Sequence, residues 1–408
     1  MKNLLIIGHT FPEPSTTAAG SRMLQLIQLF LADNYTITFA STASGGDKSV
    51  DLENLGVSSK KIQLNNPSFD DFLQKLNPTI VLFDRFITEE QFGWRVSEIC
   101  PKALKVLDTE DLHFLRKARE TAIKKEKPVE EANLFTETAK RELASIWRCD
   151  LSLIISETEM MLLQNTFAIP EDLLFYLPFL LSPTSEKQIE NLPTFKERNH
   201  FITIGNLLHA PNVDSVKILK KKIWPYIKAK LPKAELHIYG AYAPQQIEEL
   251  HNEKEGFIIK GWAANSHTVI QQAGVCLAPI RFGAGLKGKL IDAMQCGTPF
   301  VTTNIGAEGL YSASATNNGI DNWTDFIEKA IALYTDEKVW LEKQQQNFKI
   351  LNNRFDKNLF EVNLIERIFT LLNSLEAHRN KNFFGQILQH HTAQSTKFMS
   401  KWIEEKNK

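Results

Sequence analysis

Residues 278–310 read APIRFGAGLKGKLIDAMQCGTPFVTTNIGAEGL. The apolar run at residues 275–280 predicts a buried strand, and residues 300–303 predict a second one. Between them, residues 290–296 have the composition of a helix, which Gly297 brings to an end. Strand, glycine-rich loop, helix and strand in this order are typical of a parallel sheet covered by helices.

The loop RFGAGLKGK between the first strand and the helix predicts an anion site. Its glycines are Gly283, Gly285 and Gly288, and its cations are Arg281, Lys287 and Lys289. Glycines let backbone N–H groups approach an anion, and the next helix offers its positive end. A glycine loop before a helix is also ordinary turn chemistry. Three cations between three glycines favour a phosphate-bearing ligand, because charged side chains form strong hydrogen bonds to phosphate.

Composition indicates a globular protein of about two domains. The chain has 408 residues, of which 43% are hydrophobic and 23% charged, and its net charge is -1. This near-zero charge gives no overall attraction to nucleic acid, so we expect no nucleic-acid partner. The four cysteines are widely spaced and form no CxxC pair, as expected for reduced thiols in a cytoplasmic protein.

The hydrophobic runs are short. Residues 4–7 are too few for a signal peptide, and no run reaches membrane-spanning length. We therefore expect a cytoplasmic protein, with peripheral contact at the inner face of a membrane left open.

Strand and helix patterns alternate in both halves of the chain. Expected strands are 3–8, 36–41, 79–83, 103–107, 151–156, 200–204, 235–239, 256–259, 275–280 and 300–303. Expected helices are 22–31, 69–76, 112–147 with a break near Pro128, 213–231, 265–273, 323–334, 339–351 and 358–375. This alternation predicts an α/β fold with two doubly wound, Rossmann-like parallel-sheet domains facing a central cleft.

The alternation lapses in a polar, proline-containing stretch that we interpret as a linker. The predicted division is a first domain at 1–180, a linker at 181–199, a second domain at 200–372 and a helical tail at 373–408. We expect the tail to pack back on the first domain. Its anchors would be Phe383, Phe384, Ile387, Phe398 and Trp402. Contact with a membrane surface is the alternative, because cations and aromatic residues lie together there.

Several polar residues follow predicted strands and would face the cleft. In the segment 107–116, LDTEDLHFLR, Asp108 or Thr109 could simply cap a helix, whereas His113 could bond a sugar hydroxyl or phosphate. Other candidates lie in corresponding loops of the two halves: His9, Gly20 and Arg22 in the first, and Gly205, Asn206, His209 and Gly240 in the second. Asn212 could cap the helix that follows them.

Known cofactor motifs are missing from the sequence. No HExxH motif, no DxD pair in a strand-end loop and no Cys/His cluster indicate a metal site, so we expect no metal. The first strand is followed by GHTFPEP rather than GxGxxG, which disfavours a nicotinamide cofactor. We expect no cofactor.

Four stretches together resemble the retaining, family 4 glycosyltransferases of the GT-B fold. They are IGNLLHAPNVDSV at 204–216, IWPYIKAKLPKAELHIYG at 223–240, the loop and helix at 281–310, and DTEDLHFLRKARE at 108–120. The resemblance covers the chain to about residue 375. It implies metal-independent transfer of a hexose from a nucleoside diphosphate sugar to a glycan or lipid-linked acceptor, as in polysaccharide biosynthesis. The second domain would bind the nucleotide and the first the acceptor.

The resemblance also implies roles for particular residues. Asp292 stands where the family usually has a glutamate that bonds the ribose. Gly283, Gly285, Leu286 and Lys287 would line the diphosphate and sugar, and His113 would contact the donor sugar. The implied donor site is Gly205, Asn206, His209, Gly240, Gly283, Ala284, Gly285, Leu286, Lys287, Lys289 and Asp292. The implied catalytic residues are His113, Asp111, Arg281 and Lys287, and the acceptor-side residues are His9, Gly20 and Arg22.

Two departures from the family pattern have consequences. Ala284 replaces the first of two acidic residues, and Asn206 with Pro211 or Asn212 replaces a basic pair. The charge of a diphosphate would then fall to Arg281, Lys287 and Lys289. Two alternatives remain: an epimerase or phosphorylase of the same fold, and a nucleotide-binding protein that has lost catalysis.

Overall fold

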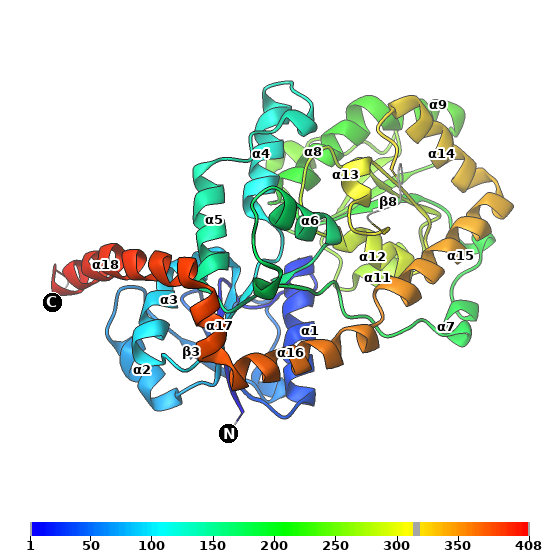
Figure 1. Cartoon of the computed structure of the whole chain (residues 1–408). Helices are drawn as coiled ribbons and strands as arrows, with labels where there is room; N and C mark the ends of the chain where they lie inside the picture. Colours follow the sequence, from blue (N-terminus) through cyan, green and yellow to red (C-terminus); the bar gives the residue numbers. More distant parts are fainter. Residues whose placement is uncertain (1, 313–318, 407–408) are drawn as a thin grey trace.

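The computed structural model describes residues 2–312 and 319–406, which form two α/β domains with parallel sheets (Figure 1). The first sheet contains β1 (Asn3–Gly8), β2 (Thr36–Ser41), β3 (Ser58–Lys61), β4 (Ile80–Asp84), β5 (Leu104–Asp108), β6 (Leu151–Ile154) and β7 (Leu174–Tyr176). The second contains β8 (Phe201–Ile204), β9 (Leu236–Tyr239), β10 (Phe257–Gly261), β11 (Val275–Ala278) and β12 (Phe300–Thr302). The predicted fold is confirmed.

Helices cover both faces of each sheet. In the first domain they are α1 (Ala18–Ala32), α2 (Ser68–Leu76), α3 (Arg85–Ile99), α4 (His113–Lys124), α5 (Glu137–Arg148) and α6 (Glu157–Asn165). Then follow α7 (Glu186–Glu190), α8 (Ala210–Ile218), α9 (Trp224–Lys230), α10 (Gln245–Glu248), α11 (Ser266–Ile270), α12 (Gly288–Gln295), α13 (Asn304–Ala307), α14 (Trp323–Thr335) and α15 (Glu337–Arg354). The last are α16 (Glu361–Asn373), α17 (Leu375–Lys381) and α18 (Phe383–Lys406).

Strand order places the cleft at the switch point of each sheet. The orders are β3-β2-β1-β4-β5-β6-β7 and β10-β9-β8-β11-β12. The strand order therefore reverses between β1 and β4 in the first sheet and between β8 and β11 in the second. In β1, Leu4 and Ile6 pack on one face while Leu5 and Ile7 pack on the other. Open sheets of this kind bind ligands beyond the carboxyl ends of their central strands.

Some elements differ from the predicted ones. Strand β3 is the sequence SSKK, fully exposed and recognisable only by its pairing with β2. Helix α3, directly after β4, and the three-residue β7 were also not predicted. The break expected near Pro128 in the helical segment 112–147 is confirmed, because α4 ends at Lys124 and α5 begins at Glu137. Polar edge strands carry no apolar pattern, because one face and one edge meet water.

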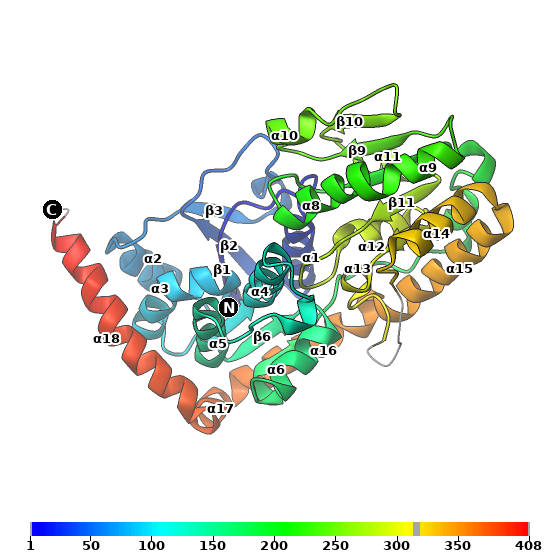
Figure 2. The same cartoon turned by 90° about the horizontal axis from the view of Figure 1, so that it is seen from above.

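The chain returns to the first domain before α16 rather than at residue 372. Leu364, Ile368 and Leu371 of α16 belong to the apolar cluster beneath β1 and β2. Helix α18 then lies against α3 and α5, along the outer edge of the first domain (Figure 2). Of the five anchors expected for it, Phe384 packs edge-on against Trp147 of α5, with ring centroids 4.9 Å apart. The other four, Phe383, Ile387, Phe398 and Trp402, are 40–65% exposed. None of the helices in the described ranges is both long and apolar enough to cross a membrane.

The two connections between the domains run side by side. The backbone N–H of Leu181 donates to the carbonyl of Phe355 (2.9 Å), and that of Lys357 donates to the carbonyl of Leu181 (2.8 Å). The outgoing and returning chain segments are therefore joined as a short parallel pair.

Candidate functional site

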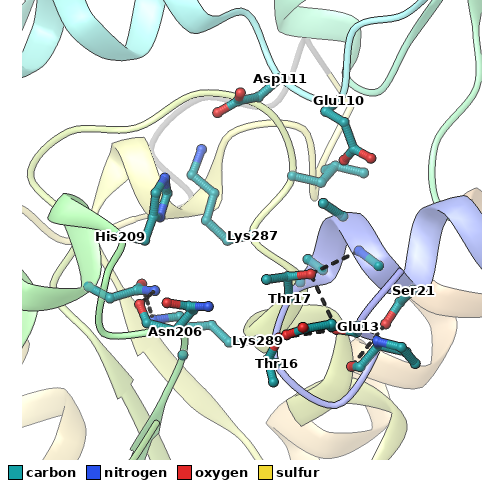
Figure 3. A pocket seen from close by; sticks show the side chains of 18 of the residues that line it. Glu13, Thr16, Thr17, Ser21, Glu110, Asp111, Asn206, His209, Lys287 and Lys289 are labelled. Atoms are coloured by element: carbon teal, nitrogen blue, oxygen red, sulfur yellow. Dashed lines mark hydrogen bonds between the residues drawn. The ribbon is translucent and has the colours of Figure 1, made fainter. Parts of the chain in front are cut away.

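A cavity of about 920 Å³ lies between the two domains, at the carboxyl ends of β1, β4, β5, β8 and β9 (Figure 3). Fourteen of the predicted site residues line it: His9, Gly20, Asp111, His113, Gly205, Asn206, His209, Gly240, Gly283, Ala284, Leu286, Lys287, Lys289 and Asp292. Three others, Arg22, Arg281 and Gly285, do not.

Lys289 lies in the first turn of α12, and its amine bonds a neutral side chain. Its Nζ donates to Oδ1 of Asn212 (2.7 Å), and Nδ2 of Asn212 donates to the carbonyl of Asn206 (2.8 Å). Burial lowers the pKa of Lys289 to about 8. A Cβ at Gly205 would lie 2.7 Å from Nδ2 of Asn212, so glycine leaves the room that this arrangement occupies. Asn212 thus orients a lysine instead of capping α8, whose N-cap is His209.

Lys287 immediately precedes α12 and lies in the buried wall of the cavity. Its Nζ donates to the carbonyl of Gly285 (2.8 Å) and is 3.8 Å from a carboxylate oxygen of Glu308. Burial lowers the pKa of Lys287, although Glu308 opposes the shift. Lys287 and Lys289 therefore place two buried or half-buried amines on the second-domain wall (Figure 3).

The glycine loop is tied to the first domain by side chains that the sequence did not single out. Arg119 of α4 pairs with both carboxylate oxygens of Glu308 (2.7 Å each) and donates to the carbonyl of Gly283 (2.8 Å). Oε1 of Glu159 accepts the backbone N–H of Gly285 (2.9 Å). Burial raises the pKa of Glu159 to about 7. The loop thus forms part of the domain interface.

Arg281 points away from the cavity. Its Nε donates to a carboxylate oxygen of Asp214 in α8 (2.9 Å), and the two groups form an ion pair. Asp214 is 67 residues away in sequence, so nothing near the loop indicates this pairing. Of the three cations in the loop, only Lys287 and Lys289 face the ligand space.

Asp292 and His209 complete the second-domain wall. Oδ1 of Asp292 is 3.6 Å from Nε2 of His267, and hydrogen bonding to Asp292 raises the pKa of His267 to about 10. His209 is different, because burial and then Arg116 lower its pKa to about 4, so this ring is neutral at pH 7.

The first-domain wall is rich in carboxylates. Asp84 accepts the backbone N–H of His9 (2.9 Å), and Asp111 forms a two-pronged bond with Arg116 (2.8 and 3.2 Å). Burial alone would raise the pKa of Asp111, but Arg116 and His113 together more than offset this, and the pKa is well below its usual value. Burial raises the pKa of Glu110 well above its usual value.

Two residues of this wall have unusual backbones. Arg85 has φ +72° and directly follows β4, and Glu110 has φ +63° and is the second residue after the neighbouring strand β5. Left-handed backbone at non-glycine residues costs free energy and is concentrated at functional sites. Both residues line the cavity. Glu110 belongs to the segment 107–116 that was expected to face the cleft, whereas Arg85 was not singled out from the sequence.

His113 is the first residue of α4, and the N-terminal end of this helix is capped by a residue distant in the sequence. Glu142 of α5 accepts the backbone N–H groups of His113 (3.0 Å) and Phe114 (2.8 Å). The local cap considered for Asp108 or Thr109 is therefore wrong: Asp108 pairs with Arg22, and the Thr109 hydroxyl donates to a carbonyl of β6.

Arg22 is a structural residue. It is 1% exposed, pairs with Asp108 (2.8 Å) and donates to the carbonyl of Leu177 (2.7 Å). Gly20, two residues earlier in α1, does line the cavity, and a Cβ there would lie 2.5 Å from the backbone of Glu13. The first residues of α1 can therefore pack closely under the loop that holds Glu13.

No metal site is evident in residues 2–312 and 319–406, where no group of three or more histidine, cysteine, aspartate or glutamate side chains could hold an ion.

Comparison with known proteins gives a family match for part of the chain and a fold for both domains. Residues 198–336 match the family described as Glycosyl transferases group 1. No curated protein matches the chain significantly in sequence. Sucrose-phosphate synthase from Thermosynechococcus elongatus has a similar structure, with a TM-score of 0.68, 13% identity, and coverage of 92% of this chain and 100% of that one.

Two further solved structures are comparably similar. TarM from S. aureus gives a TM-score of 0.66 at 10% identity, covering 92% of this chain and 100% of its own. HepE from Anabaena gives a TM-score of 0.65 at 15% identity, covering 91% of this chain and 100% of its own. These likenesses extend over both domains and establish the fold. Residues 198–336 therefore match the group 1 glycosyltransferases, and the whole chain has the same two-domain fold as these solved structures.

Proposed function

We propose that this protein transfers a sugar, with retention at the anomeric carbon, from a nucleoside diphosphate sugar to a hydroxyl of a glycan or lipid-linked acceptor. The observation that carries the proposal is the contrast between the two walls of one cleft. Lys287 and Lys289 supply amines on the second-domain wall. Asp84, Glu110 and Asp111 supply carboxylates on the opposite one, where Arg85 pairs with Asp84 and Arg116 with Asp111. A diphosphate fits the second-domain wall, and hydroxyl groups of an acceptor fit the first-domain wall.

For the donor, we propose that Lys287 and Lys289 bind the diphosphate and Asp292 bonds the ribose. The solved structures of TarM and HepE include complexes with UDP, and one of HepE contains UDP-glucose, which supports a uridine nucleotide as the first donor to test. His113 would contact the sugar. Arg281 has no part in this assignment, because its guanidinium is already paired.

In the reaction that we propose, the bond from the anomeric carbon to the diphosphate oxygen breaks and a bond to the acceptor oxygen forms on the same face. The departing phosphate oxygen takes the proton of the acceptor hydroxyl. The lysines lower the barrier because they are already oriented toward the charge that develops on the leaving group. An enclosed cleft would limit attack by water. We propose no bound metal and no cofactor for this step.

A thermal-shift screen with UDP-, GDP-, ADP- and TDP-sugars tests the donor assignment. A ligand that binds only the folded protein stabilises it by about 2.7 kcal/mol at a concentration 100 times its Kd, so the true donor should stand out. Transfer is then measured by mass spectrometry of acceptor mixtures. If no nucleotide raises the melting temperature, the proposed donor class is wrong.

Two other functions predict different products. An epimerase would turn over the donor without any acceptor, and a phosphorylase would do so only with inorganic phosphate. A protein that has lost catalysis, which Ala284 in place of an acidic residue suggests, would bind a nucleotide but neither transfer nor hydrolyse its sugar. We propose a cytoplasmic location and a role in polysaccharide biosynthesis, which expression and glycan analysis of a deletion strain would test.

A further inference from the structure

The amine of Lys287 lies close to a carboxylate but is not bonded to it. Its Nζ is 3.8 Å from Oε2 of Glu308, which is longer than a hydrogen bond, and donates instead to the carbonyl of Gly285 (2.8 Å). A lysine and a carboxylate that pair freely approach to about 2.7–2.9 Å. In Figure 3 the amine points toward the first-domain wall, where Asp111 lies. Another group must therefore occupy Glu308.

Arg119 of α4 occupies Glu308 from the opposite domain. Its Nη1 donates to Oε2 and its Nη2 to Oε1, at 2.7 Å each, so the oxygen nearest to Lys287 is already bonded. A planar guanidinium group matches both oxygens of a carboxylate, which the compact amine of a lysine does not. The two side chains are only 13% and 20% exposed, so water screens their pairing only in part. Neither of them lines the cavity.

This pairing decides how much positive charge remains for a ligand. In their charged forms, Arg119 and Lys287 carry two positive charges against the one negative charge of Glu308, which leaves one positive charge at the cavity wall. Without Arg119, Glu308 would neutralise the amine and draw it out of the cavity. The pKa of Lys287 reflects the same balance, because burial lowers it, Glu308 raises it and Arg119 lowers it.

The other partner of the amine is also held from the first domain. Oε1 of Glu159 accepts the backbone N–H groups of Gly285 (2.9 Å) and of Leu112 (2.9 Å), just before α4. Arg119 adds a second tie through the carbonyl of Gly283 (2.8 Å). The two groups between which the amine lies, the carbonyl of Gly285 and the carboxylate of Glu308, are therefore both fixed by first-domain side chains.

We propose that Arg119 is a positioning residue, which keeps the amine of Lys287 free to bind a diphosphate by occupying Glu308. The nucleotide site on the second-domain wall is thus completed by a side chain of the first domain that lies outside the cavity. Arg119 is also outside residues 198–336, the part of the chain that matches a family. The inference rests on the proposed role of Lys287 in binding the donor diphosphate.

Titration calorimetry with inorganic pyrophosphate tests this inference, since pyrophosphate has neither base nor sugar. Arg119→Met should weaken its binding about tenfold, the effect of losing one charge-assisted hydrogen bond. Adding Glu308→Gln to Arg119→Met should restore the affinity to within about threefold of the parent, because no acid then competes for the amine. Glu308→Gln alone should bind pyrophosphate at least as tightly as the parent.

Arg354→Met is the matched control. Arg354 of α15 pairs with Glu157 of α6 (3.0 Å), so this change also removes an arginine–carboxylate contact between the domains, but one that does not involve the glycine loop. Neither residue lines the cavity. Pyrophosphate affinity should stay within about twofold of the parent, as for a distant and independent site.

The double variant separates charge from loop geometry, because the tie to Gly283 is lost in it as well. If it binds as weakly as Arg119→Met, the arginine only holds the loop and the inference is wrong. Parent-like binding by Arg119→Met, weaker binding by Glu308→Gln, or no binding by the parent would also overturn it. Should Arg119→Met not fold, as judged by circular dichroism, Glu308→Gln decides by itself. Pyrophosphate binding with the expected restoration, but without binding of any nucleotide sugar, would refute the proposed function and support this inference.

Discussion

Replacing Lys289 with methionine tests whether the second-domain wall binds the diphosphate. Methionine keeps the length and apolar stem of the lysine side chain but removes its charge. Lys289 has one side-chain partner, the neutral Oδ1 of Asn212, so its charge is available to a ligand. A hydrogen bond to a charged group is worth about 1.5–3 kcal/mol, which corresponds to UDP affinity roughly 10- to 150-fold weaker.

The pH dependence makes this prediction more specific. The pKa of Lys289 in the free protein is about 8, and a bound diphosphate favours the charged amine. Nucleotide affinity should therefore fall as pH rises through 8. If only the charged amine binds, the affinity at pH 9 should be about tenfold below that at pH 7. The methionine variant should lose this component of the pH dependence.

Isothermal titration calorimetry with UDP at constant ionic strength, from pH 7 to 9.5, measures both effects. Lys217→Met is the control, because Lys217 lies on α8 outside the cavity and bonds Gln246 (2.9 Å). It should leave affinity and its pH profile unchanged. Affinity of Lys289→Met within twofold of the parent, together with an unaltered pH profile, would refute the assignment.

Three other substitutions separate structural from ligand-binding residues. Arg22→Met breaks the buried pair with Asp108 and should cost about 3–5 kcal/mol in the free energy of unfolding, measured with urea; a loss below 1 kcal/mol would contradict that role. Arg281→Met should leave UDP affinity within twofold, since this side chain is outside the cavity; a tenfold loss would restore it to the donor site. Gly205→Ala places a Cβ 2.7 Å from Nδ2 of Asn212 and should weaken UDP binding about tenfold, by calorimetry, while circular dichroism stays native; unchanged affinity would show that the contact relaxes freely.

The fold was largely predictable because both central strands are buried on both faces. Continuous apolar runs such as residues 4–7 and 275–278 mark strands of a parallel sheet without any tertiary information. Strand β3, with the sequence SSKK, could not be found this way, since only its pairing partner makes it a strand.

The candidate site was predictable where one short segment supplies it. Lys287 and Lys289 share a loop with the glycines, so local sequence was enough. Long-range partners were not predictable: Glu159 contacts the loop across 126 residues, and Glu142 caps α4 from 29 residues away. The sequence also does not show which partner a charged side chain will have: Arg281 pairs with Asp214 and does not line the cavity.

The paired connections at Leu181 and Phe355–Lys357 have a mechanical consequence. Because the outgoing and returning segments are bonded to each other, they form one hinge with a single axis instead of two independent tethers. Rotation about this axis would widen or narrow the cleft while both sheets stay intact, and few residues would need to change their backbone angles. Helices α16–α18 lie on the first-domain side of the hinge. The second domain could therefore swing against the first while the contacts of α16–α18 with the first domain stay unchanged.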